Sequence, residues 1–134
     1  MCSTLRVLNV VTGRLWSFAA PPGTAGWTPA GFNRVSAISP GGRMLAAYAL
    51  TGAARQGRVR LYVVHLGGAG RIAVVPSSAV LLSAGLAWTV RGSWLLYQGS
   101  SGHLWAYQAA TGRTRRFSTP CCQYTATVAA RSRG

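Results

Sequence analysis

The sequence lacks acidic residues altogether, and this absence excludes several kinds of chemistry. Its 134 residues include no aspartate and no glutamate, whereas average composition would supply about 15 of them. Without side-chain carboxylates, the chain forms no acid/base pair for glycoside hydrolysis, no Ser-His-Asp triad and no carboxylate cage for calcium or magnesium. We therefore expect a protein that is not an enzyme and that carries no cofactor.

Lysine is absent as well, so all 14 basic residues are arginine and the formal net charge is +14. No arginine has a side-chain carboxylate partner within the chain. The positive charges therefore repel one another, and counter-ions or an acidic partner would relieve this repulsion. Adhesion to acidic polymers at low salt follows from the charge alone.

Cysteine is scarce, because Cys2, Cys121 and Cys122 are too few and too clustered for a disulfide framework. Zinc sites use spaced cysteines, and only Cys2, His65 and His103 could add ligands to the adjacent pair. A catalytic histidine needs a nucleophile and usually an orienting carboxylate, so both histidines are read as polar residues near strand ends. We expect ordinary thiols and no metal site.

Long apolar runs are also missing. The least polar stretch, residues 72–90, is interrupted by Pro76, Gly85 and three serines, while a membrane helix needs about 20 mostly apolar residues. The N-terminus lacks the basic segment and apolar core of a secretory signal. The sequence predicts no membrane span and leaves the compartment open.

What the sequence does contain is an internal repeat. Residues 37–47 align with residues 87–97 at an offset of 50 positions and without a gap. Each segment is an apolar strand, a turn that ends in glycine and a second apolar strand, which is the pattern of a β-hairpin. Pro40 sets the backbone angle at the second position of the first turn.

A second hairpin recurs beside the first. Residues 5–14 align with residues 104–113 at an offset of 99, and residues 61–71 show the same pattern with one residue inserted in the turn. The full repeat therefore holds four strands in about 50 residues. Short strands that recur at this period are typical of β-propeller blades.

The motifs at the strand ends resemble those of WD40-like propellers, in which an apolar or aromatic residue is followed by Asp, then by two further residues and then by Thr-Gly. Residues 107–112 read Tyr-Gln-Ala-Ala-Thr-Gly, and residues 8–13 read Leu-Asn-Val-Val-Thr-Gly. Residues 39–42 and 89–92 resemble the Ser-Pro-Asp-Gly hairpin of WD40-like and bacterial TolB-like propellers. The resemblance covers residues 5–117 and implies an all-β fold whose blades each hold four antiparallel strands.

The departures from this pattern all remove acids. Positions where the family favours Asp hold Asn9, Gly41, His65, Arg91 and Gln108. The Asp-His-Ser/Thr network of many WD40 blades therefore cannot form, and stability must come from packing. Asn9 is still able to bond to its own backbone as in an Asx turn, whereas Gln108 and His65 do so less readily.

These patterns predict a single β-propeller segment of about two and a half blades, which is an incomplete ring. Residues 5–18 form a half-blade, 35–76 a blade, 85–118 a second blade, and 119–134 a candidate extra strand with a frayed tail. Strands are expected near residues 35–38, 44–50, 58–65, 71–75, 86–89, 94–98, 103–108 and 113–117. Residues 19–34 and 77–84 are expected to be connections, and no helix is predicted.

An incomplete ring leaves sheet edges open, and open edges aggregate. The missing part is therefore expected to come from the remaining blades of a longer propeller or from a homo-oligomer. The expected function is non-enzymatic binding of a protein partner or a ligand. A remnant of a propeller enzyme would need carboxylates from elsewhere.

The alternative is a basic protein that binds an acidic polymer or nucleic acid. Arginines that flank two loops are the candidate anion contacts. These residues are Arg55, Arg58, Arg60, Arg113, Arg115 and Arg116. Arg58 shares a strand face with Arg60, and Arg113 shares one with Arg115, because side chains two positions apart point to the same side of a strand. The basic residues are nevertheless spread over every blade, and most aromatic residues occupy strand positions where blades would pack.

Overall fold

The computed structural model describes residues 3–28, 38–51, 58–68, 70–78, 80–81, 86–99 and 103–117. Within these ranges the chain forms strands and no helix, and every strand pairing is antiparallel. The all-β fold class that the sequence predicts is confirmed. The predicted extra strand at residues 119–134 lies outside the described residues.

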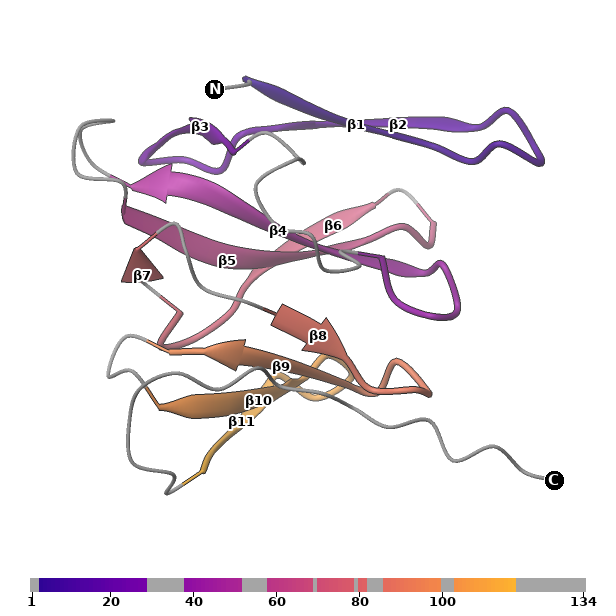
Figure 1. Cartoon of the computed structure of the whole chain (residues 1–134). Helices are drawn as coiled ribbons and strands as arrows, with labels where there is room; N and C mark the ends of the chain where they lie inside the picture. The colour runs from indigo at the N-terminus through magenta and orange to yellow at the C-terminus, as the bar shows by residue number, and fades with distance from the viewer. Residues whose placement is uncertain are drawn as a thin grey trace, which may run out of the picture.

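The strands form three sheets that lie one above another (Figure 1). The first is a hairpin of β1 (Thr4–Leu8) and β2 (Leu15–Ala19). The middle sheet has the order β3 (Thr24–Trp27), β4 (Met44–Thr51), β5 (Arg58–His65) and β6 (Arg71–Val74), and β7 (Val80–Leu81) pairs with the start of β5. The last sheet holds β8 (Leu86–Trp88), β9 (Trp94–Gln98), β10 (Leu104–Gln108) and β11 (Arg113–Arg116) in chain order.

Most expected strands are present. β5 and β9 have the predicted bounds, and β4, β6, β8, β10 and β11 differ from theirs by a single residue at one end. Of the strand expected at residues 35–38, only Ile38 is described, and it forms an isolated bridge to Leu45.

Two strands lie where the sequence indicated connections. Residues 19–34 contain β3, which pairs with the end of β4, and residues 77–84 contain β7. Prolines and glycines lie around β3, so the sequence there does not have the pattern of a strand. The register with β4 shifts between Thr24 and Gly26. Tertiary contacts stabilise β3 instead, since Trp27 is buried and its indole N–H donates a hydrogen bond to the carbonyl of Phe18.

β4 and the second half of β5 are largely buried on both faces, which explains why residues 44–50 and 61–64 read as continuous apolar runs. Side chains alternate between the two faces along a strand. Val59, Leu61 and Val63 of β5 belong to the core toward the last sheet. Tyr62 and Val64 belong to the core toward the β1–β2 hairpin. Packing of three layers in this way gives the chain two cores instead of one.

β5 changes its partner along its length, from β7 at its start to β6 at its end. The buried hydroxyl of Ser78 fills the place between them. It accepts a hydrogen bond from the Leu61 N–H at 3.0 Å and donates one to the Val75 carbonyl. The Val75 N–H in turn donates to the Leu61 carbonyl. The backbone of β5 therefore stays paired across the change.

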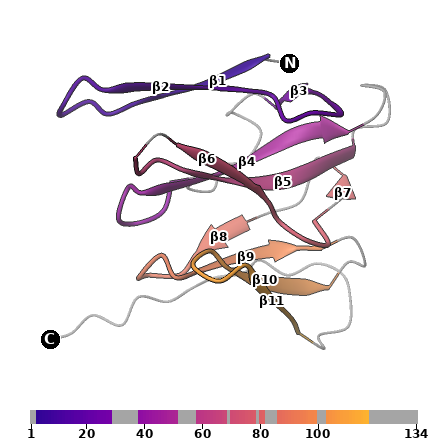
Figure 2. The same cartoon turned by 180° about the vertical axis from the view of Figure 1, so that it is seen from behind.

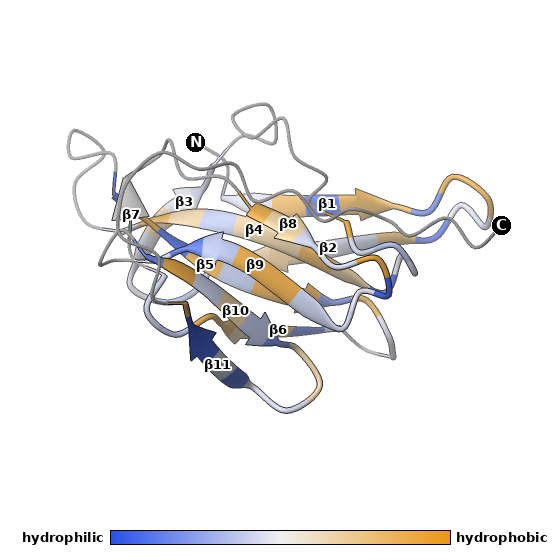
Figure 3. Ribbon diagram, turned by 60° about the horizontal axis from the view of Figure 1, so that its bottom comes forward, coloured by the Kyte–Doolittle hydropathy of each residue, from blue (hydrophilic) through white to orange (hydrophobic). Residues whose placement is uncertain are grey.

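Several turns lie at one end of the stack, which we call the turn end. They are the turns of the β1–β2, β5–β6, β8–β9 and β10–β11 hairpins and the turn that precedes β4 (Figures 1 and 2). Colouring by hydropathy shows that the tip of the β1–β2 hairpin is apolar and that β11 is hydrophilic (Figure 3). The turn end is the part of the structure that carries the candidate site.

Candidate functional site

Arginines gather at the turn end because a turn glycine is repeatedly next to an arginine in the sequence. Gly13, Gly42, Gly70 and Gly112 all have positive φ and close their turns, and the next residue in each case is arginine. In the β8–β9 turn the order is reversed, and an arginine precedes Gly92. The resulting set, all exposed, is Arg14, Arg43, Arg71, Arg91 and Arg113.

Contacts bring these turns side by side. The Arg14 guanidinium donates a hydrogen bond of 2.8 Å to the Gly68 carbonyl, which joins the β1–β2 hairpin to the β5–β6 turn. A Cβ placed on Gly92 would lie 3.4 Å from Pro40, so the β8–β9 turn packs against the turn before β4. The turn end is therefore one continuous surface drawn from all three sheets.

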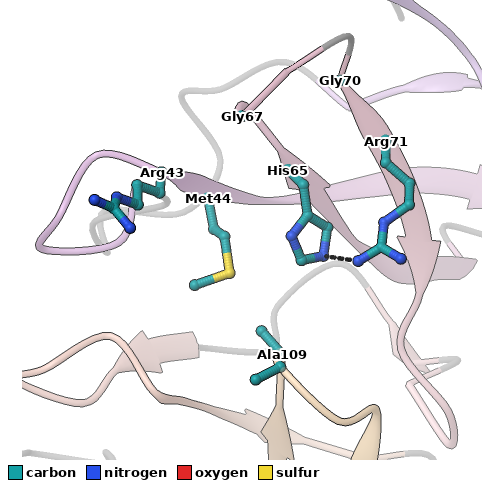
Figure 4. A pocket seen from close by; sticks show the side chains of 8 residues that line it. Arg43, Met44, His65, Gly67, Gly70, Arg71 and Ala109 are labelled. Carbon is teal, nitrogen blue, oxygen red and sulfur yellow. Dashed lines mark hydrogen bonds between the residues drawn. The ribbon is translucent and has the colours of Figure 1, made fainter.

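A groove with a volume of about 520 Å³ opens at this end, between the middle sheet and the last sheet. Arg43 and Arg71 flank it on opposite sides, with Met44 and His65 between them and Ala109 across from them (Figure 4). Gly67, Gly70 and Ala110 complete the lining. Small residues thus leave the space open, while the charged groups stand at its borders.

Arg71 and His65 are paired residues of β6 and β5, and their side chains meet in the groove (Figure 4). The Arg71 guanidinium donates to the imidazole Nε2 at 3.4 Å. Burial, and then the charge of Arg71, lower the pKa of His65 below its usual 6.5. The imidazole is therefore neutral at pH 7 and acts as the acceptor that orients the guanidinium.

Tyr107 lies in the core beneath the same region, and burial raises the pKa of its hydroxyl while the charge of Arg71 acts in the opposite direction. Ala109, two residues further along the chain, is buried in that core. The groove is therefore a cationic opening above an apolar wall. Among the residues that the structure describes, no three side chains of the metal-binding types come together.

The arginines selected from the sequence are only partly brought together. Arg58 and Arg60 are exposed on the first part of β5, away from the turn end, toward which β5 runs. Arg113 lies at the turn end, and Arg115 and Arg116 follow it along β11. Arg55, Cys2, Cys121 and Cys122 lie outside the described residues.

Sequence reasoning missed Arg14, Arg43, Arg71 and Arg91, although a signal was present. The arginines named from the sequence are close together in the chain, whereas the structure gathers arginines that recur beside the glycines of successive turns. A Gly-Arg dipeptide marks Arg14, Arg43 and Arg71. Arg91 instead precedes its glycine, and the same dipeptide also occurs at Arg58, away from the turn end. Periodic spacing of this kind places side chains at one end of stacked hairpins.

Searches against protein-family descriptions and against curated proteins found no match for this chain. Among the described residues, none belongs to a helix that could cross a membrane. The geometry of the turn end is therefore what bears on function.

Proposed function

We propose that this chain is a section of a WD40-like β-propeller that works as a non-enzymatic binding module, with the turn end as its binding surface. The observation that carries the proposal is that strand pairing recurs at the offset of the sequence repeat. Ile38 bridges Leu45, and 50 residues later Trp88 pairs with Leu95. Sheets that repeat their register and stack face to face are what a run of blades requires.

The turns of the two aligned hairpins support this proposal in detail. The Ser39 hydroxyl accepts a hydrogen bond of 3.1 Å from the Met44 N–H, and Thr89 accepts one of 3.1 Å from Trp94. The residues are spaced alike in both turns. Equivalent polar contacts at non-identical residues indicate the same local structure rather than chance similarity of composition.

The hairpins at the offset of 99 give independent support. Gly13 donates its N–H to the Asn9 carbonyl, and Gly112 donates to the Gln108 carbonyl, each at 2.8 Å. The side chains of Asn9 and Gln108 form different hydrogen bonds, as the sequence predicts. The Asn9 carboxamide oxygen accepts from two backbone N–H groups of its turn, whereas the Gln108 oxygen accepts from the Thr111 hydroxyl. The backbone turn is thus kept without the usual Asp.

The outer face of the β1–β2 hairpin is uncovered, and exposed apolar side chains lie along it and at its tip, which supports an incomplete ring. Leu8 and Val10 are 58% and 85% exposed on the β1–β2 hairpin. Their equivalents 99 residues later, Tyr107 and Ala109, are 4% and 6% exposed because the middle sheet covers them. A further sheet on β1–β2 would bury apolar area worth about 1–2 kcal/mol for each such side chain. In a longer chain another segment would supply this sheet, and when the 134 residues are alone a second copy supplies it.

Sedimentation velocity tests the proposal with two matched variants. Leu8→Lys places a charge on the uncovered face, whereas Val74→Lys makes the same change at a similarly exposed residue of β6. We expect the unmodified chain to form particles larger than its own 14.1 kDa. Leu8→Lys should reduce their mass, and Val74→Lys should leave it unchanged. A monomeric unmodified chain, or equal effects of the two variants, would contradict the proposal.

A second candidate function, binding of an acidic polymer, is favoured by the arginines of the turn end. Each phosphate or sulfate contact that releases a counter-ion makes affinity fall as salt rises. A titration with heparin at increasing salt distinguishes the two functions. Affinity that persists at physiological salt supports polymer binding, whereas affinity that vanishes there contradicts it.

A further inference from the structure

We infer that the groove between the middle and last sheets binds an organic anion, with an oxyanion head group at Arg71 and an aliphatic body against Met44 and Ala109. The inference rests on the proposed function, because it names the ligand class of that binding module. Three features of the groove carry it: its charge, its prepared guanidinium and its lining.

The charge of the groove fits an anion. Arg43 and Arg71 stand on its two sides, and the entire chain offers no Asp or Glu side chain to neutralise them. A guanidinium in most proteins has a carboxylate partner nearby, and a ligand must compete with that partner. Here an oxyanion meets no such competitor, and its binding also relieves repulsion between the arginines.

The Arg71 guanidinium is held in place before a ligand arrives. One of its nitrogens donates to His65 Nε2 at 3.4 Å, and within the described part of the chain the guanidinium makes no other hydrogen bond. A guanidinium has five N–H donors, so enough remain to bind two oxygens of a carboxylate or phosphate side by side. Fixing the side chain in advance reduces the entropy lost on binding.

The size of the groove and the apolar residues that line it fit a ligand with an apolar body. A volume of about 520 Å³ lies within the roughly 300–1,000 Å³ of sites for organic ligands and is much larger than a free phosphate needs. Met44 and Ala109 face this space (Figure 4). Gly70 has a φ of 87°, and a Cβ there would lie 2.8 Å from the Phe18 ring, so this wall stays small.

An aliphatic body fits better than a nucleotide base. Base recognition in single-stranded nucleic acids uses aromatic side chains for stacking. The described residues that line the groove include no Phe, Tyr or Trp. Tyr107 is buried beneath it, and the Trp16 ring is covered by the Arg14 guanidinium at 4.6 Å. The one ring among these lining residues, the His65 imidazole, already accepts a hydrogen bond from Arg71, so the site offers charge and aliphatic contact rather than a large aromatic surface for stacking.

Isothermal titration calorimetry with hexyl phosphate tests the inference, with inorganic phosphate and hexanol as the two halves of the ligand. We expect hexyl phosphate to bind at least about tenfold more tightly than either half, since about 1.4 kcal/mol corresponds to a factor of ten. Equal affinity for inorganic phosphate would overturn the role of the apolar wall. Absence of hexyl phosphate binding at millimolar concentration would overturn the site itself.

Two variants of equal charge localise the binding. Arg71→Gln removes the guanidinium in the groove and should weaken hexyl phosphate binding about tenfold or more, as expected for a charge-assisted pair. Arg58→Gln removes one at the opposite end of β5 and should change affinity by less than about twofold. Equal losses in both variants would mean that net charge alone attracts the ligand, which would overturn the inference.

A third variant closes the groove without changing the charge. Ala110 is exposed and lines the groove, so Ala110→Trp should abolish hexyl phosphate binding while circular dichroism stays unchanged. Undiminished binding would contradict the site. If the unmodified chain assembles and its assembly is sensitive to Leu8→Lys, but it does not bind hexyl phosphate, then this inference fails and the binding module stands. If assembly itself is absent, the proposed function fails.

Discussion

Two buried tyrosines allow the polar contacts of the core to be tested by one chemical change made twice. Tyr97 is 1% exposed, and its hydroxyl donates a hydrogen bond of 2.6 Å to the Pro76 carbonyl. Tyr48 is 5% exposed, and its hydroxyl has no partner among the described residues. Replacement of either by phenylalanine removes a single oxygen and leaves the ring in place.

The two variants should change stability in opposite directions. Tyr97→Phe loses a buried hydrogen bond, which destabilises by about 1–2 kcal/mol. Tyr48→Phe removes an unpaired hydroxyl from the core, so we expect no loss and a gain of up to about 1 kcal/mol. The two variants should thus differ by about 1–3 kcal/mol, and at about 3–5 °C for each kcal/mol in a domain of this size their Tm values should differ by roughly 3–15 °C.

Thermal unfolding followed by circular dichroism, in the assembled state and at one protein concentration, measures the difference. A denaturant titration gives the same comparison and shows whether the transition is two-state. Equal changes in both variants, or greater destabilisation by Tyr48→Phe, would refute the assignment of the two hydroxyls.

Three further predictions follow from the same contacts. Ser78→Ala should lower the free energy of unfolding by about 1–2 kcal/mol, because it leaves the Leu61 N–H unpaired in the core. Ser77→Ala, at the exposed neighbouring residue, should change it by less than about 0.5 kcal/mol. Chemical denaturation measures both changes. Because the pKa of His65 is lowered, the unfolded chain binds its proton more readily, so stability should fall as the pH drops from 6.5 toward the lowered pKa. With no carboxylate side chains to titrate, stability should then change little down to about pH 2, and His65→Gln should remove the fall; a second unfolding step near pH 4 would contradict this reasoning. At alkaline pH the tyrosines should lower stability. Burial raises the pKa of Tyr48 to about 12 and also raises the pKa values of Tyr97 and Tyr107. Above pH 10 these tyrosines ionise in the unfolded chain before they ionise in the folded one, so the free energy of unfolding should fall.

The strands with strong local patterns were predictable from the sequence, and those held by distant contacts were not. β5 and β9 are apolar runs with β-branched or aromatic residues between turn signals, so their bounds follow from the residues alone. β3 follows two prolines and contains a glycine, and it is a strand because β4 pairs with it and Trp27 enters the core. Tertiary pairing therefore overrides the local signal there.

The arginine content of the candidate site was predictable from the sequence, but its position was not. The absence of acids and the abundance of arginine indicate an anionic ligand from composition alone. Arg43 and Arg71 are 28 positions apart in the sequence and meet at one groove only because the turns of two hairpins lie side by side. That arrangement depends on how the sheets stack, which no local pattern specifies. A Gly-Arg dipeptide marks both Arg43 and Arg71 in the sequence, whereas the groove between them forms only in the folded structure.

Electron cryo-microscopy of the particle that the chain forms tests the central claim most directly, because the claim concerns how the sheets continue. The proposal predicts sheets arranged around an axis, with the outer face of β1–β2 covered by another sheet and the turn ends on one rim. A particle in which Leu8 and Val10 remain uncovered, or in which the sheets stack without rotation into a ring, would contradict it.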